Sequence, residues 1–435
     1  MSIDKKEPIK IMGINLPVYL VLGVVLLLAF FLGVIPKDMI GAFAVMIYFG
    51  GLLNLIGNKL PIVNKYLGGG PIIVIFGSAA LMHFLGHIPQ VEIINETVST
   101  FMKGGGFLDF YIAALITGSI LGMDRKLLIK ASVRYLPCIL GGVIVAVLLA
   151  GLGGYLVGFS FKESTAYISI PIMGGGMGAG AVPLSEIFGS GLGVDPSQVL
   201  SKMVPAVALG NAMSIVAGGL LDRLGKAKPA LTGNGELVRS QEAAIDATAE
   251  DVTDEGFKLS DFGIGIVVAC TFFIFGKIIY KFVPQIHNYA WMIISVAIVK
   301  IANIMPKSIE HAATKWYQFV TSNFTAALLF GIGVAYTDLG EIISAFSISY
   351  LFIVLLTVLG AIIGSGVVGQ LVGFYPIEAA ITGGLCMSNM GGTGDVATLS
   401  AANRMELMPF AQISSRIGGA VILLLATALM PFLFG

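Results

Sequence analysis

The chain has 435 residues, of which 56% are hydrophobic and only 11% are charged, and its mean hydropathy is +0.93. Because about a quarter of a typical soluble domain is charged, this composition excludes a soluble globular protein and predicts an integral protein of the lipid bilayer. The 25 basic and 25 acidic residues balance, which leaves no positive field to attract nucleic acid. Cys138, Cys270 and Cys386 are far apart in apolar runs and predict neither disulfides nor a zinc site.

Segments long enough to cross a bilayer as a helix, about 20 apolar residues, follow one another along the chain. The sequence predicts an all-α protein with eleven spans, at residues 15–35, 38–58, 70–89, 106–123, 135–159, 198–221, 261–282, 288–305, 318–336, 346–374 and 410–434. The polar start of the chain has no small-residue cleavage site after its first apolar stretch, so no removed signal peptide is expected.

Two further apolar stretches, residues 164–190 and 376–400, are rich in glycine and small polar residues. Irregular backbone at membrane depth is tolerated only where it is buried in protein or lines a watery cavity. These stretches are therefore predicted to be broken or re-entrant segments rather than spans facing lipid.

The distribution of positive charge predicts the orientation of the chain. With the N-terminus in the cytoplasm, most of the 25 Lys and Arg residues fall on the cytoplasmic side, which also places the C-terminus outside. The long polar stretch at residues 222–260 is then a cytoplasmic linker. It separates a leader with the first span (residues 1–36) and a first repeat (37–221) from a second repeat (261–435).

The two halves share three anchors in the same order. Asp124 and Asp338 each end a span and are 214 residues apart; the sequence LVGF recurs at an offset of 215, at 156–159 and 371–374; and a GGxG signature recurs at an offset of 216, at 175–178 and 391–394. Five spans in each half give the second half the opposite orientation. Inverted repeats with paired glycine-interrupted segments indicate a secondary transporter whose site lies between those segments.

Polar residues gather around the second signature and the start of the last span. An ionisable side chain inside the membrane costs several kcal/mol, so Arg416 is a candidate for function, and its guanidinium suits a carboxylate. An anionic substrate is therefore expected. The alternative is a structural ion pair of Arg416 with Asp395 or Glu378. Arg404 is expected to be an interfacial charge on the cytoplasmic side.

Broken helices also leave backbone carbonyls free at one end, which attract cations. The neighbouring side chains that could add oxygen ligands for sodium are Asn389, Thr393, Ser414 and Ser415. Alternatively, the hydroxyl groups bond back to their own helix. After the first signature, Glu186 is either a proton or cation site or an acid that faces the cytoplasm or forms a structural pair.

The sequences PIMGGGMGAGAVPLSEI, NMGGTGD and AQISSRIGGA resemble the signatures of the 2-hydroxycarboxylate transporter family, the bacterial carriers of citrate, malate and lactate. The resemblance covers essentially the whole chain. It implies a homodimer in the bacterial inner membrane, with two inverted five-span halves and two re-entrant hairpins that meet at the site. It also implies an elevator motion, no enzymatic activity, and no cofactor other than a coupling ion, Na+ or H+.

The resemblance and the polar pattern together define two groups of site residues. The group predicted to bind substrate comprises Arg416, Thr393, Gly178, Gly392, Met177 and Met390. The group predicted to bind the cation comprises Asn389, Ser415, Ser414 and the carbonyl oxygens of Cys386 and Met387. Arg416 resembles the family's arginine that binds a substrate carboxylate, and Thr393 stands where its sodium-citrate carriers have a serine.

Two positions depart from the sodium-citrate pattern. Met177 replaces an asparagine in the first signature, and Met390 replaces a second substrate-binding arginine before the second signature. One charge-assisted contact contributes about 1.5 to 3 kcal/mol, so its loss should weaken binding of a third carboxylate. The departures favour L-malate as substrate, with citrate possible.

Three functions follow from these observations. The favoured one is symport of a 2-hydroxycarboxylate with a cation, and the alternative of the same class is exchange of malate or citrate for lactate. The alternative of another class is the membrane subunit of a sodium-pumping decarboxylase, which would carry no organic acid by itself.

Overall fold

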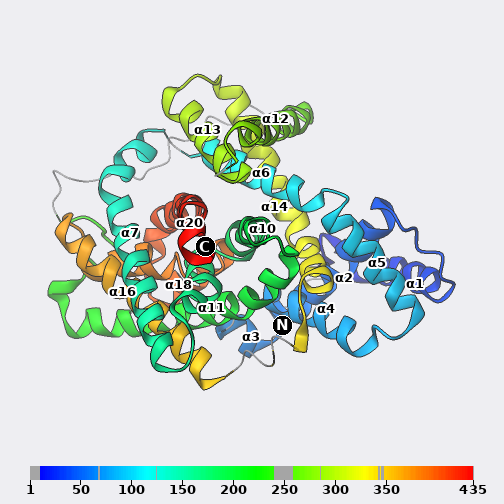
Figure 1. Ribbon diagram of the computed structural model, residues 1–435, viewed down its shortest axis with the longest axis horizontal. Helices are drawn as coiled ribbons and strands as arrows, with labels where there is room; N and C mark the ends of the chain where they lie inside the picture. Colours follow the sequence, from blue (N-terminus) through cyan, green and yellow to red (C-terminus); the bar gives the residue numbers. More distant parts are fainter. Residues whose placement is uncertain are drawn as a thin grey trace, which may run out of the picture. The chain divides into compact units, whose positions relative to one another are not determined.

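The computed structural model describes residues 10–66, 69–123, 125–239, 258–284, 286–340, 343 and 347–434, without the side chains at 65, 66, 126–134 and 393. The described chain is mostly helical, which confirms an all-α membrane protein (Figure 1). A short antiparallel hairpin of β1 (Lys10–Ile11) and β2 (Ile14–Asn15) was not predicted. The chain divides into two compact units.

The first unit comprises Met1–Asn64, Gly69–Asp109 and Thr321–Gly340. Its helices are α1 (Leu16–Phe31), α2 (Met39–Lys59), most of α3 (Pro61–Tyr66), α4 (Gly70–Leu85), α5 (Pro89–Lys103) and the last part of α14 (Lys307–Ala335). The ring of Phe43 packs against those of Phe101, Phe107 and Phe324, with centroids 4.9 to 5.5 Å apart. This aromatic cluster joins α2 and α5 to α14.

The second unit comprises Lys65–Gly68, Phe110–Val320 and Glu341–Gly435. Its α-helices are most of α6 (Phe107–Leu121), α7 (Arg125–Leu156), α8 (Phe161–Glu163), α9 (Ile170–Ile172), α10 (Val182–Leu192), α11 (Pro196–Ala227), α12 (Ser260–Phe282), α13 (Asn288–Ala302), the first part of α14, α16 (Ile348–Leu371), α17 (Pro376–Ala379), α18 (Gly392–Ala401), α19 (Met408–Ile413) and α20 (Gly419–Phe434). Its π-helical turns are η1 (Ser164–Ser169), η2 (Met177–Ala181), η5 (Ala380–Leu385) and η7 (Ser414–Gly418), and its 3-10 turns are η3 (Pro229–Leu231) and η6 (Met405–Leu407).

Helices α7 and α16 lie in direct backbone contact within the second unit. A Cβ atom on Gly364 would lie 2.1 Å from the Gly141 carbonyl oxygen, and one on Gly360 would lie 2.5 Å from the Ala146 Cα atom. Small residues permit such close packing of helices in membranes. These two helices are the ones that precede the two glycine-rich segments in the sequence.

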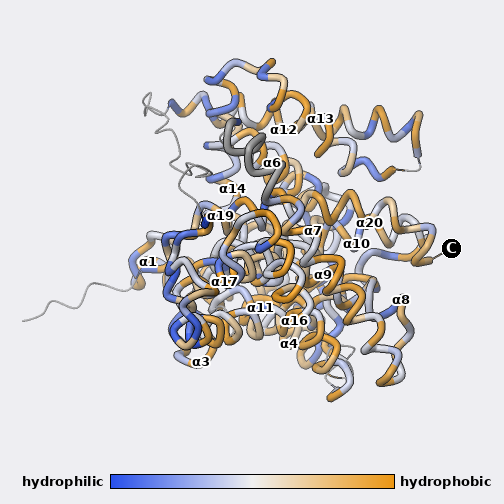
Figure 2. Tube along the Cα trace, turned by 90° about the vertical axis from the view of Figure 1, so that its left-hand side faces the viewer, coloured by the Kyte–Doolittle hydropathy of each residue, from blue (hydrophilic) through white to orange (hydrophobic). Residues whose placement is uncertain are grey.

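Seven helical segments of the described chain are long and apolar enough to cross a membrane: α2, α7, α11, α12, α14, α16 and Met405–Phe434. The pair α5 and α6, bent by 44°, adds an eighth if it forms one span, while α1, α4 and α13 are shorter apolar helices. Figure 2 accordingly shows hydrophobic colours along most of the helical trace. Every predicted span overlaps a helix, but the count of eleven and the inversion of the halves remain predictions.

Two elements differ from the sequence prediction. Helix α5 occupies a stretch that was expected to be a connection, and its buried residues Val91, Ile94, Val98 and Met102 recur at helical spacing along one face. The predicted linker at residues 222–260 is also shorter than expected. Helix α11 continues to Ala227 and α12 begins at Ser260, while residues 240–257 lie outside the described residues.

Candidate functional site

Both glycine-rich segments are helices interrupted by a short irregular stretch, as the sequence predicts. The first passes from α9 to η2 through residues 173–176, and the second passes from η5 to α18 through residues 386–391. Gly176 and Gly391 have φ angles of 113° and 65°, which residues with a side chain rarely adopt. The glycines of the two signatures therefore allow the chain to turn at both breaks.

The two breaks contact each other within the second unit. A Cβ atom on Gly175 would lie 2.6 Å from the Ser415 carbonyl oxygen, and one on Gly176 would lie 2.6 Å from the Met390 carbonyl oxygen. No side chain fits at these distances. The structure thus brings the first signature together with the second signature and with the SSR sequence at the start of the last predicted span, both of which lie more than 200 residues further along the chain.

Ordered groups also surround the start of the first segment. The backbone N–H of Glu163 donates to the Ser160 hydroxyl at 3.1 Å. In return, the Glu163 carboxylate accepts hydrogen bonds from the Ser160 hydroxyl at 2.8 Å and from the Ser160 backbone N–H at 3.1 Å. These hydrogen bonds hold the pKa of Glu163 below its usual value. This capping box fixes where the first segment begins.

A buried carboxylate, Asp395, lies beside the second break. The Asn389 amide nitrogen donates to its Oδ1 atom at 3.0 Å, and the Ser415 hydroxyl lies 3.0 Å from its Oδ2 atom. In the described part of the chain, no Lys or Arg forms an ion pair with Asp395. An ionised carboxylate without a cation is costly to bury, so this position is suited to a bound cation or a proton.

The predicted cation ligands have different surroundings. The Asn389 amide oxygen accepts the Gly391 N–H at 2.7 Å, so Asn389 both shapes the break and contacts Asp395. The Ser415 hydroxyl lies 3.0 Å from the Ala411 carbonyl oxygen and can donate to it or to Asp395. The hydroxyl of Ser414 instead lies 2.7 Å from that of Tyr135 on α7. Ser414 therefore faces a different neighbour from Ser415.

The backbone of the second break supplies further oxygen atoms. Cys386 and Met387, both fully buried, lie in its irregular part. Among the described residues, no backbone N–H donates to either of their carbonyl oxygens. The role of these two carbonyls as cation ligands stays a prediction.

Arg416 lies in the π-helical turn η7, a geometry that is frequent at functional sites. The residue is partly exposed, and its guanidinium lies over the Tyr317 ring, 5.4 Å from the centroid. Within the described residues it forms no ion pair with Asp395 or Glu378. The role of Arg416 in binding a substrate carboxylate therefore stays a prediction, and so does the structural alternative.

The other predicted substrate residues lie at the two breaks. Met177 is buried and begins η2, and Gly178 follows it. Met390 is the last residue but one before α18, and Gly392 is its first residue. The backbone of residue 393 is in α18, but its side chain lies outside the described residues, so the prediction for Thr393 cannot be compared with a contact.

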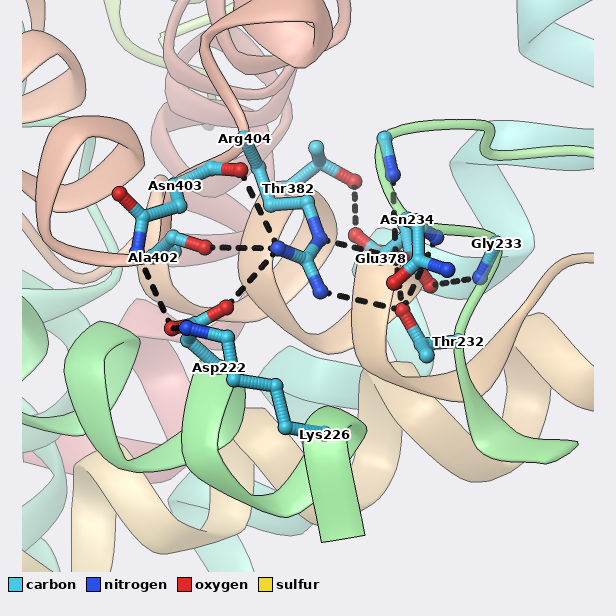
Figure 3. Close-up of polar contacts among 11 residues, drawn as sticks. Asp222, Lys226, Thr232, Gly233, Asn234, Glu378, Thr382, Ala402, Asn403 and Arg404 are labelled. Carbon is cyan, nitrogen blue, oxygen red and sulfur yellow. Dashed lines mark hydrogen bonds and ion pairs between the residues drawn. The ribbon is translucent and has the colours of Figure 1, made fainter. Parts of the chain in front are cut away.

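Arg404 is buried, which corrects the expectation of an interfacial charge; only 4% of its surface is exposed. Figure 3 shows its guanidinium between two carboxylates: Nη1 lies 3.0 Å from Asp222 Oδ1, and Nε lies 3.1 Å from Glu378 Oε1. Its Nη2 atom donates to the Thr232 hydroxyl at 3.2 Å. The expectation failed because the sequence does not reveal which acids approach Arg404 from α11 and α17.

The first residues of the linker are fixed to this ion cluster. The Thr232 hydroxyl and the Gly233 N–H donate to the Glu378 carboxylate at 2.5 and 3.0 Å (Figure 3). Further on, the Tyr375 N–H donates to the Leu237 carbonyl oxygen and the Arg239 N–H to that of Gly373. Residues 232–239, which we call the strap, therefore bind the start of the second glycine-rich segment.

Comparison with known proteins identifies the family of the chain. Residues 11–428 match the sequence model of the 2-hydroxycarboxylate transporter family. The malate transporter MleP of Lactococcus lactis subsp. lactis (strain IL1403) is 40% identical over 434 residues, which cover 99% of this chain and 100% of that protein. The Na(+)-malate symporter of Bacillus subtilis (strain 168) is 41% identical over 425 residues, which cover 96% of this chain and 92% of that protein.

The citrate/sodium symporter of Salmonella typhimurium (strain LT2) is 39% identical over 424 residues, which cover 96% of this chain and 94% of that protein. The family and these relatives are transporters, so the chain is a transporter and not an enzyme. With the family model matched over nearly its whole length, the chain belongs to the 2-hydroxycarboxylate transporter family.

Proposed function

We propose that the protein is a secondary active transporter that carries 2-hydroxycarboxylates, L-malate before citrate, together with Na+ or H+. The observation that carries this proposal is the meeting of the two glycine breaks beside the buried carboxylate of Asp395 and near Arg416, whose guanidinium forms no ion pair within the described residues. The first group suits a cation and the second suits an anion. The names of similar proteins mention malate, citrate and sodium, which supports both the proposed substrate and the proposed coupling cation.

For the cation, we assign the carboxylate of Asp395, the hydroxyl of Ser415 and the carbonyl oxygens of Cys386 and Met387. These are hard oxygen donors of the kind that alkali cations take when half-helix ends face a central site. No group of three His, Cys, Asp or Glu residues in the described chain could hold a metal ion, so a site rich in neutral oxygens fits better than a transition-metal site. Na+ is the coupling ion that the names of two relatives favour.

For the anion, we assign Arg416 as the residue that binds a substrate carboxylate. Changing Arg416 to Lys keeps the charge but replaces the planar, bidentate fork with a single ammonium group. The half-saturation concentration for malate should rise about tenfold or more, since a charge-assisted contact contributes about 1.5 to 3 kcal/mol. Initial rates of uptake into proteoliposomes over a range of malate concentrations measure this; unchanged kinetics would remove Arg416 from the site.

Substrate choice is assigned to Met390, where the sodium-citrate pattern has an arginine. Changing Met390 to Arg adds a second cation near the substrate and should shift preference towards citrate, the acid with a third carboxylate. Competition between labelled malate and unlabelled citrate measures the ratio of the two half-saturation concentrations. A tenfold shift towards citrate is expected, and Met390→Leu serves as the uncharged control. Identical ratios in both variants would contradict the assignment.

The movement proposed for transport is an elevator motion in a homodimer, with a cytoplasmic N-terminus, an external C-terminus and inverted halves. Both glycine breaks and all the assigned ligands belong to the second compact unit, which is the candidate for the moving part. The first unit, with its aromatic cluster, is the candidate for the fixed part. Cysteine labelling from each side of the membrane, at single positions of the second unit, tests this assignment.

The mode of coupling is tested by transport in proteoliposomes with defined contents. Uptake of labelled L-malate that requires an inward cation gradient establishes symport and names the ion. Uptake that requires lactate inside would establish exchange instead. A protein that carries neither malate nor citrate under any of these conditions would contradict the proposal and leave the decarboxylase subunit as the remaining hypothesis.

A further inference from the structure

Helix α11 presents a polar face to the second glycine break. The Asn211 Oδ1 atom accepts the backbone N–H of Met390 at 3.0 Å. One turn further on, the Ser214 hydroxyl donates to the Ser388 carbonyl oxygen at 3.1 Å and lies 3.2 Å from the Ser388 hydroxyl. Asn211 and Ser214 are fully buried, so these bonds form away from water.

The same face of α11 touches both breaks. A Cβ atom on Gly210 would lie 2.9 Å from the side chain of Ile172, just before the first break, and 3.3 Å from the Ser388 carbonyl oxygen in the second break. Such a short distance leaves little freedom for the backbone on either side. Helix α11 is therefore a common support for the two segments that meet at the proposed site.

Backbone groups in a helix break lose their partners in the helix and need others when they are buried. Two consecutive N–H groups of the second break, those of Met390 and Gly391, are each accepted by an amide oxygen, from Asn211 and Asn389 respectively. Asn389 also donates to Asp395. The backbone at Met390 is thus held from α11, while the next residue is held by the group that contacts the proposed cation site.

The two amides also fit closely around one glycine. A Cβ atom on Gly394 would lie 2.7 Å from Asn211 Oδ1 and 3.0 Å from Asn389 Oδ1. This contact places Asn211 directly against the first turn of α18, which carries Asp395. A change in the position of the Asn211 side chain would therefore reach Met390 and the backbone of this turn together.

We propose that Asn211 is a positioning residue for transport: by holding the N–H of Met390, it fixes the tip of the second break and so sets both substrate choice at Met390 and cation affinity at Asp395. Ser214 supports the same break one turn further along α11. This inference rests on the proposed function. It adds to the site a residue from a helix outside both signatures, which acts through the backbone and not by contact with the substrate.

The test compares Asn211→Leu and Asn211→Ala with wild type in proteoliposomes. Leucine has a similar size but leaves the Met390 N–H without an acceptor, and alanine leaves room for a water molecule. Thr357→Val is the matched control, because Thr357 is fully buried and its hydroxyl donates to the Ile353 carbonyl oxygen of its own helix, with no other hydrogen bond within the described residues. The quantities measured are the half-saturation concentrations for malate and for the driving cation, the citrate-to-malate ratio, the maximal rate and the amount of reconstituted protein.

For Asn211→Leu, we expect a rise of about tenfold in the half-saturation concentration for malate, for the driving cation or for both, together with a changed citrate-to-malate ratio. Asn211→Ala should show a smaller change in the same direction. Thr357→Val should keep wild-type values. If both Asn211 variants alter only the maximal rate or the amount of protein, with affinities and ratio as in wild type, Asn211 is a packing residue and the proposal is wrong. A wild-type protein that carries no acid would instead refute the proposed function itself.

Discussion

Changing Asp395 to Asn is expected to abolish accumulation of malate driven by a cation gradient. The substitution keeps the shape of the side chain but removes the negative charge. The new amide oxygen can accept from Asn389, and the new amide nitrogen can donate to the Ser415 hydroxyl in place of the present bond. Because no described Lys or Arg forms an ion pair with Asp395, a bound cation or a proton would neutralise this buried charge. Uptake with and without the gradient should become equal in the variant, a loss of at least tenfold in accumulation.

The neighbouring serines provide a matched pair for the same experiment. Ser415→Ala removes a hydroxyl that lies against Asp395 and should raise the half-saturation concentration for the cation several-fold. Ser414→Ala removes the adjacent hydroxyl, which lies against Tyr135, and should leave cation affinity unchanged. Retained gradient dependence in Asp395→Asn, or equal effects of the two serines, would show that the cation binds elsewhere.

Changing Arg404 to Met is expected to produce the largest loss of stability. The substitution leaves two buried carboxylates, Asp222 and Glu378, without their shared cation. Removing one partner of a buried ion pair typically costs about 3 to 5 kcal/mol, because the remaining charge stays buried and unpaired. The midpoint of thermal denaturation in detergent should fall by well over the experimental error, and the strap, which binds the same Glu378, should become accessible to protease.

Lys226 is the matched control for Arg404. It also contacts Asp222, at 2.7 Å, but 68% of its side chain is exposed. An exposed ion pair contributes about 0 to 1 kcal/mol, so Lys226→Met should shift the midpoint only slightly. Adding Glu378→Gln to Arg404→Met should recover part of the loss by removing one unpaired charge. Equal shifts for Arg404 and Lys226 would contradict the role assigned to the buried cluster.

The sequence predicted those features that depend on local composition. Apolar length located the helices, and the two GGxG signatures located the breaks. Glycine at 175, 176 and 391 indicated irregular backbone, and the structure shows the close contacts that require it. The meeting of the two breaks followed from the repeat and the family resemblance, and the geometry within the second unit agrees with it.

Features that depend on contacts between distant segments were not predicted. Arg404 was expected at the surface because its partners Asp222 and Glu378 are 182 and 26 residues away, and only folding brings them together. Asp395 was considered only as a partner for Arg416, although its position one turn into α18 beside Asn389 was a usable signal. Asn211 lies in an apolar span with no motif, so nothing local marks it.

Helix α5 was missed for a different reason. It contains Glu92, Glu96 and Lys103, so its mean hydropathy is too low for a span, although one face is regularly apolar. A search for helical periodicity, in addition to apolar length, would have found it. The length of an apolar segment therefore does not reveal amphipathic helices that lie between spans.

In the proposed function, a cation gradient drives a 2-hydroxycarboxylate through the site between the two glycine breaks. The most direct test is accumulation of labelled L-malate in proteoliposomes that contain no carboxylate and face an inward Na+ or H+ gradient, with Asp395→Asn measured in parallel. Wild type is expected to accumulate malate above the external concentration, whereas Asp395→Asn should only equilibrate it. Equal accumulation by both proteins, or none by wild type under either gradient, would contradict the proposed function.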